Sequence, residues 1–262
     1  MNDDQSIWRI SKGYGPVLAV ALHDGHDIRE GLEELMAVDE ATRLREEDPF
    51  TREWTTIAPT RIVALRSRFE VDLNRPRDKA VYMTEEDAWG LQVWKEAVPE
   101  QVVKQSLAEY DSFYRCCYEL FLEMKQRHGR FVVLDLHSYN HRRGGPDMEQ
   151  DDPAMNPQIN LGTATMNRER WSGLVDRFVS DLRSVEFPDG NLDVRENVRF
   201  GGGWFSRWVH ETFPEEGCVL AIEVKKIFID EWTGEPCPEL IDAMGEALGS
   251  VIPGIMDELD AL

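Results

Sequence analysis

Short, almost continuous apolar runs constrain the fold of this chain more than any other feature. Three of them lie far apart, at residues 16–22, 131–136 and 219–224. Each is too short to be a typical core helix, and runs of this length are typical of strands buried on both faces of a sheet. The sequence therefore predicts buried strands at these positions, with a further strand at 61–65.

Helical patterns separate these runs. The clearest spans 101–127, where apolar side chains recur every three or four residues and Gly129 follows as a stop signal. Other helical patterns occupy 28–45, 168–183 and 238–261, the last interrupted near Pro253. Alternating strands and helices predict an α/β fold, a three-layer α/β/α sandwich around a mostly parallel mixed sheet. Because no repeat or linker interrupts the chain, residues 1–262 are predicted to form a single domain.

The charge balance narrows the possible partners. The 262 residues include 50 Asp and Glu against 29 Lys and Arg, a formal net charge of −21. This excess argues against binding to nucleic acid or to an anionic membrane surface, since both need clustered basic residues. No apolar run reaches the roughly 18–20 residues that span a bilayer. Residues 1–5 lack the features of a signal peptide, so a cytoplasmic protein is predicted.

The predicted strands end in residues that bind metals or transfer protons. The first is followed by His23 and His26, the third ends next to His137, and the last contains Glu223. Strand ends of a parallel sheet meet at one edge, where ligands bind. Three nitrogen or oxygen ligands with one open position are typical of catalytic zinc. The third ligand stays open between His26 and a carboxylate from 46–48, and Glu223 is the candidate general base.

An arginine-rich segment follows the second predicted strand. Residues 66–77 contain four Arg, together with Asn74, in an otherwise acidic chain. Guanidinium groups bind carboxylates through paired hydrogen bonds, so the segment can form a pocket for an anionic substrate. The alternative is a surface cluster of ion pairs that offsets the surplus acidic residues.

Together these segments resemble the N-formylglutamate amidohydrolase family, which is related in fold to zinc carboxypeptidases and aspartoacylase. The similarity extends in order from residue 17 to about residue 235. The segments that carry it are His23–His26, Ser67–Arg75, Leu134–Ser138, Asn160–Thr163 and Ala221–Val224.

The resemblance implies a single zinc ion and assigns its ligands. His23 and His137 correspond to metal ligands, and Asp48 corresponds to the acidic position after the first helix. Carboxypeptidase-like enzymes have Glu three residues after the first His, where this chain has His26. The third ligand is therefore left open between His26 and Asp48, with Glu47 as a further alternative.

The resemblance also implies roles for the substrate-binding side chains. Arg68 corresponds to the residue that stabilises an oxyanion. Asn74 and Arg75 resemble the pair that binds a substrate carboxylate, with Asp72 orienting them. Arg199 is a further candidate for the same carboxylate.

The expected function is zinc-dependent hydrolysis of an N-formyl or N-acyl amide on a small anionic amino acid such as glutamate. Glu223 corresponds to the catalytic glutamate of the wider group and would act as general base. One alternative is a metallo-carboxypeptidase or isopeptidase-type enzyme that uses the same groups. The other is a metal- or partner-binding member of the fold without turnover.

Overall fold

A seven-stranded mixed sheet forms the centre of the computed structural model, which describes residues 6–262. Residues 1–5, on which the argument against a signal peptide rests, lie outside the described residues. The strand order is β1-β3-β2-β4-β9-β5-β8. The strands of this sheet are β1 (Trp8–Ser11), β2 (Val17–Ala21), β3 (Thr60–Ala64), β4 (Phe131–Tyr139), β5 (Ile159–Gly162), β8 (Val194–Glu196) and β9 (Gly217–Lys225). A separate hairpin joins β6 (Glu186–Phe187) to β7 (Gly190–Asn191).

The four central strands, β3, β2, β4 and β9, are parallel. The outer strand β1 is antiparallel to β3, whereas β5 is antiparallel to β9 and parallel to β8. The predicted α/β fold with a mostly parallel mixed sheet is therefore confirmed. Its central strands are those that the apolar runs predicted.

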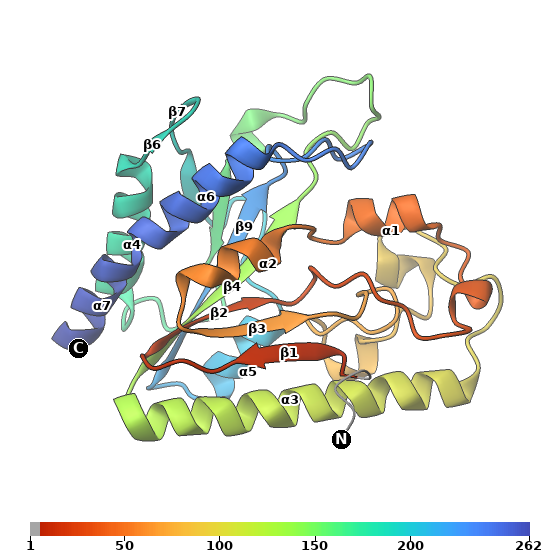
Figure 1. Ribbon diagram of the computed structural model, residues 1–262, viewed down its shortest axis with the longest axis horizontal. Helices are drawn as coiled ribbons and strands as arrows, with labels where there is room; N and C mark the ends of the chain where they lie inside the picture. Colours follow the sequence, from red (N-terminus) through yellow and green to blue (C-terminus); the bar gives the residue numbers. More distant parts are fainter. Residues whose placement is uncertain (1–5) are drawn as a thin grey trace.

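Helices cover both faces of the sheet (Figure 1). The helices are α1 (Glu40–Glu46), α2 (Thr51–Trp54), α3 (Glu100–His128), α4 (Ser172–Ser184), α5 (Trp204–Thr212), α6 (Pro238–Ser250) and α7 (Ile252–Ala261). Side chains of α3 and α5 pack on one face, and those of α2, α4, α6 and α7 pack on the other. None of the helices among residues 6–262 combines the length and apolarity needed to cross a membrane.

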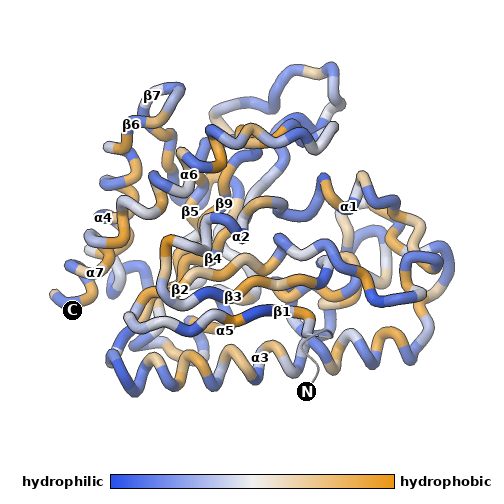
Figure 2. Tube along the Cα trace, viewed as in Figure 1, coloured by the Kyte–Doolittle hydropathy of each residue, from blue (hydrophilic) through white to orange (hydrophobic). Residues whose placement is uncertain are grey.

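The central strands contribute alternate side chains to two hydrophobic cores, one on each face of the sheet. Val17 and Ala19 of β2 belong to the core beneath α4, α6 and α7, whereas Leu18 and Val20 belong to the core beneath α3. Successive strand side chains point to opposite faces, so a run that is apolar throughout is buried on both. Figure 2 shows this pattern as hydrophobic central strands, with α3 alternating between hydrophobic and hydrophilic residues.

The predicted helix at 28–45 is wrong before Glu40 and is confirmed only in its last part, which belongs to α1. The segment is largely irregular, and α1 begins only at Glu40, after Asp39, whose side chain accepts a hydrogen bond from the Thr42 backbone. Gly31 has a φ of 82°, which interrupts any continuous helix. Among the apolar residues that suggested helical spacing, Ile28 and Met36 pack instead in a cluster with Val93, on a loop that is distant in the sequence. There the backbone of Ala37 donates to the Val93 carbonyl at 2.8 Å.

The remaining helix predictions hold, with shifted ends. The helix predicted at 101–127 is α3, which ends at Gly129. The helix predicted at 168–183 begins at Ser172 as α4. The break predicted near Pro253 falls at Val251, between α6 and α7. Pro253 then lies in the first turn of α7, where a missing N–H costs no hydrogen bond.

Candidate metal centre and active site

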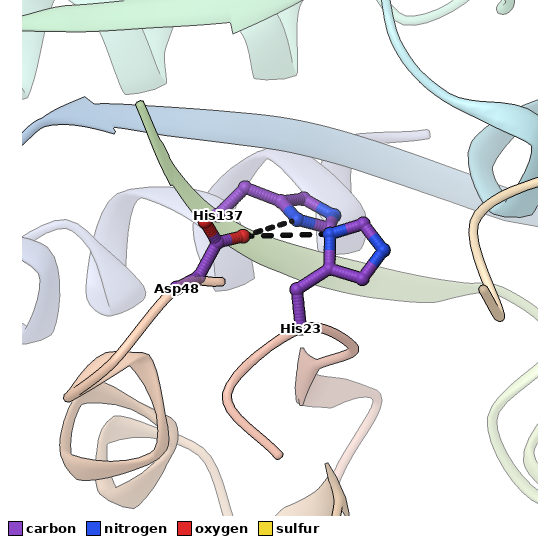
Figure 3. A group of neighbouring side chains, drawn as sticks. All are labelled: His23, Asp48 and His137. Atoms are coloured by element: carbon purple, nitrogen blue, oxygen red, sulfur yellow. Dashed lines mark hydrogen bonds and ion pairs between the residues drawn. The ribbon is translucent and has the colours of Figure 1, made fainter. Parts of the chain in front are cut away.

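His23, Asp48 and His137 come together at the carboxyl edge of the central strands (Figure 3). His23 follows β2, His137 lies near the end of β4, and Asp48 lies between α1 and α2. The Oδ2 atom of Asp48 is 3.0 Å from Nδ1 of His137 and 3.5 Å from Nδ1 of His23. All three side chains are buried. We refer to these residues as the His–Asp–His cluster.

The outer nitrogens of the two imidazoles are held by further carboxylates. His23 Nε2 lies 2.7 Å from Asp72 Oδ1, and His137 Nε2 lies 3.0 Å from Asp135 Oδ1. A carboxylate at Nε2 keeps the proton on that nitrogen and leaves the Nδ1 lone pair free to bind a metal. Both rings therefore present Nδ1 to the same point beside Asp48.

Electrostatics in the cluster favour a bound cation. Burial alone would raise the pKa of Asp48, but hydrogen bonds from His137 and His23 hold that pKa well below its usual value. Burial likewise opposes the charged form of His137, yet Asp135 and Asp48 raise the pKa of this imidazole well above its usual value. Burying these carboxylates is therefore favourable only when protons or a metal ion supply positive charge beside them.

The donor set fits a divalent metal. Two imidazole nitrogens and one carboxylate oxygen lie within 4.8 Å of one another, so the cluster can hold a metal ion. Ser138 Oγ donates to Asp48 Oδ1 at 3.1 Å and fixes the orientation of that carboxylate. Three protein ligands of this kind leave a coordination position open, as in catalytic zinc sites.

The structure brings neither His26 nor Glu47 into the cluster. His26 is partly exposed, and its Nδ1 lies 2.5 Å from Glu47 Oε2. The other carboxylate oxygen of Glu47 accepts a hydrogen bond from Ser67. The hydrogen bond that the His26 imidazole donates to the Glu47 carboxylate is the main cause of a raised pKa for His26. Among the three alternatives for the third ligand, only Asp48 faces both imidazoles.

Glu223 shares a cavity of about 660 Å³ with the His–Asp–His cluster. This cavity, which we call the strand-end cavity, opens at the carboxyl edge of β4 and β9. Glu223 is the register partner of His137 across these two strands. Burial raises the pKa of Glu223 to about 7, although His137 opposes the rise. A carboxylate with a pKa near neutrality can accept a proton and later return it.

Arg68 lines the strand-end cavity and is held from three sides. Its Nη2 donates to Asp72 Oδ2 at 2.9 Å, and its Nε donates to the Tyr82 hydroxyl at 3.1 Å. The guanidinium carbon lies 4.8 Å from the ring centroid of Trp89. Burial would lower the pKa of Arg68, but Tyr82 and Asp72 raise it, so the guanidinium stays charged.

Asn74 and Arg75 also line the strand-end cavity. Asn74 Nδ2 lies 3.3 Å from His137 Nε2, and its Oδ1 accepts from the backbone of Phe205 at 3.0 Å. Arg75 is more open, with its side chain 42% exposed. Asp72 contacts the pair, accepting from the Asn74 backbone at 2.8 Å.

Arg199 has a different environment. Its Nη1 donates to Asn156 Oδ1 at 2.5 Å, and its guanidinium lies near the rings of Tyr139 and Phe200. Arg199 is not among the residues that line the strand-end cavity, although its neighbour Phe200 is. Both rings that Arg199 packs on, Tyr139 and Phe200, line the cavity, so Arg199 lies behind its wall.

The glycines at 201–203 allow a close approach of the chain to Asn74. A Cβ atom at Gly203 would lie 2.2 Å from Asn74 Oδ1, a distance that real contacts do not reach. The Asn74 amide thus packs directly on the backbone that begins α5. The glycine run serves packing at this edge of the cavity.

Sequence reasoning missed several residues of the strand-end cavity, including Trp89, Arg143, Arg207 and Lys226. Arg143 reaches Glu46 at 3.4 Å, and the Trp89 indole donates to the same carboxylate at 3.2 Å. Lys226 had a signal, because it is a basic residue close after Glu223 in a buried run. Arg207 had no such signal in the sequence, because α5, the helix that carries it, was not predicted.

Comparisons with known proteins identify a family and a shared fold. The sequence model described as N-formylglutamate amidohydrolase matches residues 15–229. A crystal structure of N-formylglutamate amidohydrolase from Ralstonia eutropha JMP134 is 18% identical, with a TM-score of 0.76 over 98% of this chain and 99% of that one. The structure of a gene product from Agrobacterium tumefaciens is 19% identical, with a TM-score of 0.63 over 95% of this chain and 97% of that one.

No curated protein sequence matches the chain. At less than 25% identity, the two structural matches establish a shared fold and no more. The sequence model, by contrast, covers most of the chain, from before β2 to beyond β9. The chain therefore belongs to the N-formylglutamate amidohydrolase family.

Proposed function

We propose that this chain is a zinc-dependent amidohydrolase that removes a formyl or other acyl group from the nitrogen of an anionic amino acid, as in N-formylglutamate. The observation that carries the proposal is that the His–Asp–His cluster and Glu223 line one cavity. Membership of the family supports the reaction class.

His23, Asp48 and His137 would hold the zinc ion. When bound, zinc supplies a Lewis acid that polarises a carbonyl and lowers the pKa of water toward ~7. Asp72 and Asp135 keep both imidazoles in the tautomer that binds a metal through Nδ1.

Glu223 is the proposed general base. With its pKa near 7, its carboxylate accepts the proton of the attacking water and then donates that proton to the departing amide nitrogen. One residue can serve both steps because the proton stays within the cavity.

Arg68 is proposed to stabilise the negative charge that develops on the carbonyl oxygen. Its contacts with Asp72, Tyr82 and Trp89 fix the guanidinium before substrate arrives, so little reorganisation is needed. Asn74 and Arg75 are proposed to bind a substrate carboxylate through charge-assisted hydrogen bonds. Arg199, which packs on the cavity-lining rings of Tyr139 and Phe200, is a further candidate for the same carboxylate.

The direct test is hydrolysis of N-formyl-L-glutamate by the zinc-loaded protein, followed as release of glutamate. A panel of longer N-acylglutamates and short peptides with C-terminal glutamate runs beside it. The proposal expects turnover of the N-formyl or N-acyl compounds, abolished by Glu223→Gln. Turnover of the peptides alone would instead indicate a peptidase. Absence of turnover in zinc-loaded, folded protein would indicate a binding protein.

A further inference from the structure

Lys226 is a buried lysine at the edge of the strand-end cavity. It directly follows β9, three residues after Glu223, and its exposed fraction is 2%. Its Nζ donates to the backbone carbonyls of Arg45 at 2.6 Å and Glu47 at 2.7 Å. Among the described residues, no carboxylate lies within ion-pair distance of this ammonium group. The two carbonyls are therefore its main partners.

These carbonyls belong to the C-terminal end of α1. The last carbonyls of a helix lack partners within the helix, and cationic side chains can satisfy them. Here the partners come from distant segments. The Arg45 carbonyl also accepts from Asn140 Nδ2 at 3.0 Å, and the Glu46 carbonyl accepts from Arg68 Nη1 at 3.4 Å. Lys226 contributes the shortest of these contacts and spans both sides of Glu46.

The segment that Lys226 holds leads directly into Asp48. Glu47 precedes Asp48, and the Asp48 backbone donates to the His23 carbonyl at 2.9 Å. On the other side, Thr51 Oγ1 donates to the Asp48 carbonyl at 2.7 Å. Lys226 therefore connects the strand that carries Glu223 to the short connection that carries Asp48.

We propose that Lys226 is a positioning residue for Asp48, fixing the backbone before this carboxylate so that the His–Asp–His cluster retains its metal. The inference rests on the proposed function in one respect, the role of Asp48 as a metal ligand. Lys226 acts through the carbonyls of Arg45 and Glu47. Loss of its ammonium group removes the Lys226 bond to the Glu47 carbonyl and leaves the Arg45 carbonyl with Asn140 as its remaining side-chain donor, which frees the connection to move and weakens metal binding.

Lys225 provides a matched control. It is the neighbouring residue, it is 9% exposed, and its Nζ donates to the Asn156 carbonyl at 3.2 Å, on a different segment. The experiment measures the zinc dissociation constant by competition with a chelator, for wild type, Lys226→Met and Lys225→Met. Urea unfolding of the metal-free proteins runs in parallel. We expect Lys226→Met to weaken zinc binding about 10–100-fold, as for other residues that orient metal ligands, and Lys225→Met to leave it within about threefold.

A double-mutant cycle separates positioning from general stability. If Lys226 acts through Asp48, Lys226→Met will cost little further zinc affinity in an Asp48→Asn background, although it still lowers unfolding stability there. Lys226→Arg keeps a cationic donor and is expected to lose less affinity than the methionine variant. It also keeps the test open if Lys226→Met does not fold.

Two results would overturn the inference in distinguishable ways. Wild-type zinc affinity in Lys226→Met, or an equal loss with and without Asp48, would remove the positioning role and leave the proposed function intact. Failure of folded wild type to bind zinc would remove the metal assignment itself, and this inference with it.

Discussion

His137 and Glu223 are register partners in the neighbouring parallel strands β4 and β9. Paired residues of adjacent strands project to the same face of a sheet, so an imidazole of the His–Asp–His cluster and a carboxylate with a raised pKa are brought together by strand pairing alone. The relative position of the candidate metal site and the proposed base is thus set by the pairing of two central strands.

Replacing Glu223 by Gln should separate metal binding from turnover. The amide keeps the size of the side chain but cannot accept a proton, so kcat should fall by about 10²–10⁴. Because Glu223 is not one of the three clustered ligands, zinc content should stay at the wild-type level. Steady-state kinetics with N-formylglutamate, combined with elemental analysis, check both parts. Loss of zinc together with activity would mean that Glu223 has a different role.

The raised pKa of Glu223 also predicts a pH-dependent stability of the metal-free chain. The folded pKa of about 7 exceeds the ordinary value of 4.5, so between these values the folded state holds a proton that the unfolded state has lost. The contribution of the Glu223 carboxyl to folding stability is complete below pH 4.5 and is lost as the pH rises through 7. Glu223→Gln lacks this dependence. The difference in free energy of unfolding, variant minus wild type, should therefore be roughly 1–3 kcal/mol larger at pH 8 than at pH 4.5. Denaturant titrations at the two pH values measure it, and parallel profiles would contradict the account.

Asp135 should affect zinc affinity without contacting the metal. Its carboxylate is 3.0 Å from His137 Nε2, and Ser206 Oγ donates to its other oxygen at 3.2 Å. Asp135→Asn removes the charge that fixes the tautomer, so the zinc dissociation constant should rise about 10–100-fold. Asp111→Asn, which affects a carboxylate paired with Arg77 at the surface, is the control. Equal affinities of the two variants would show that the Asp135 contact does not matter.

Arg75 should contribute to substrate binding more than to the chemical step. Arg75→Gln removes a charged donor from the strand-end cavity, so KM for N-formylglutamate should rise about tenfold with little change in kcat. Arg77→Gln is a control from the same segment, since Arg77 is 54% exposed and paired with Asp111. A similar KM for both variants would count against a carboxylate-binding role for Arg75.

The central strands could be predicted because each buries both faces and so appears as an apolar run. The outer strands β5 and β8 are only four and three residues long, and β8 is largely polar. Their formation depends on pairing with β9 and with each other, which a local pattern does not reveal. The segment at 28–45 failed for the opposite reason, because its apolar spacing imitates a helix while its partners lie on a distant loop.

Residues of the candidate site could be predicted where a side chain that binds metals or transfers protons lies at the end of a predicted strand. His23, His137 and Glu223 were found in this way, and the edge of the sheet brings them together. Asp48 could not be selected from residues 46–48 by pattern, because its orientation depends on contacts with distant residues such as Ser138. The contacts of Lys226 were missed for a similar reason, since the Arg45 and Glu47 carbonyls are brought near it only by the folded chain. Asp135, by contrast, lies two residues before His137 on the same face of β4, so strand alternation could have indicated its contact.

Metal content is the most direct test of the central claim. Elemental analysis of purified wild-type protein beside His137→Ala should give about one zinc per wild-type chain and a strongly reduced content in the variant. In the proposed site His137 would supply one of three ligands, so its loss would remove a donor that water cannot replace with equal affinity. A well-folded wild-type protein that holds no zinc, even after zinc is added back, would contradict the account.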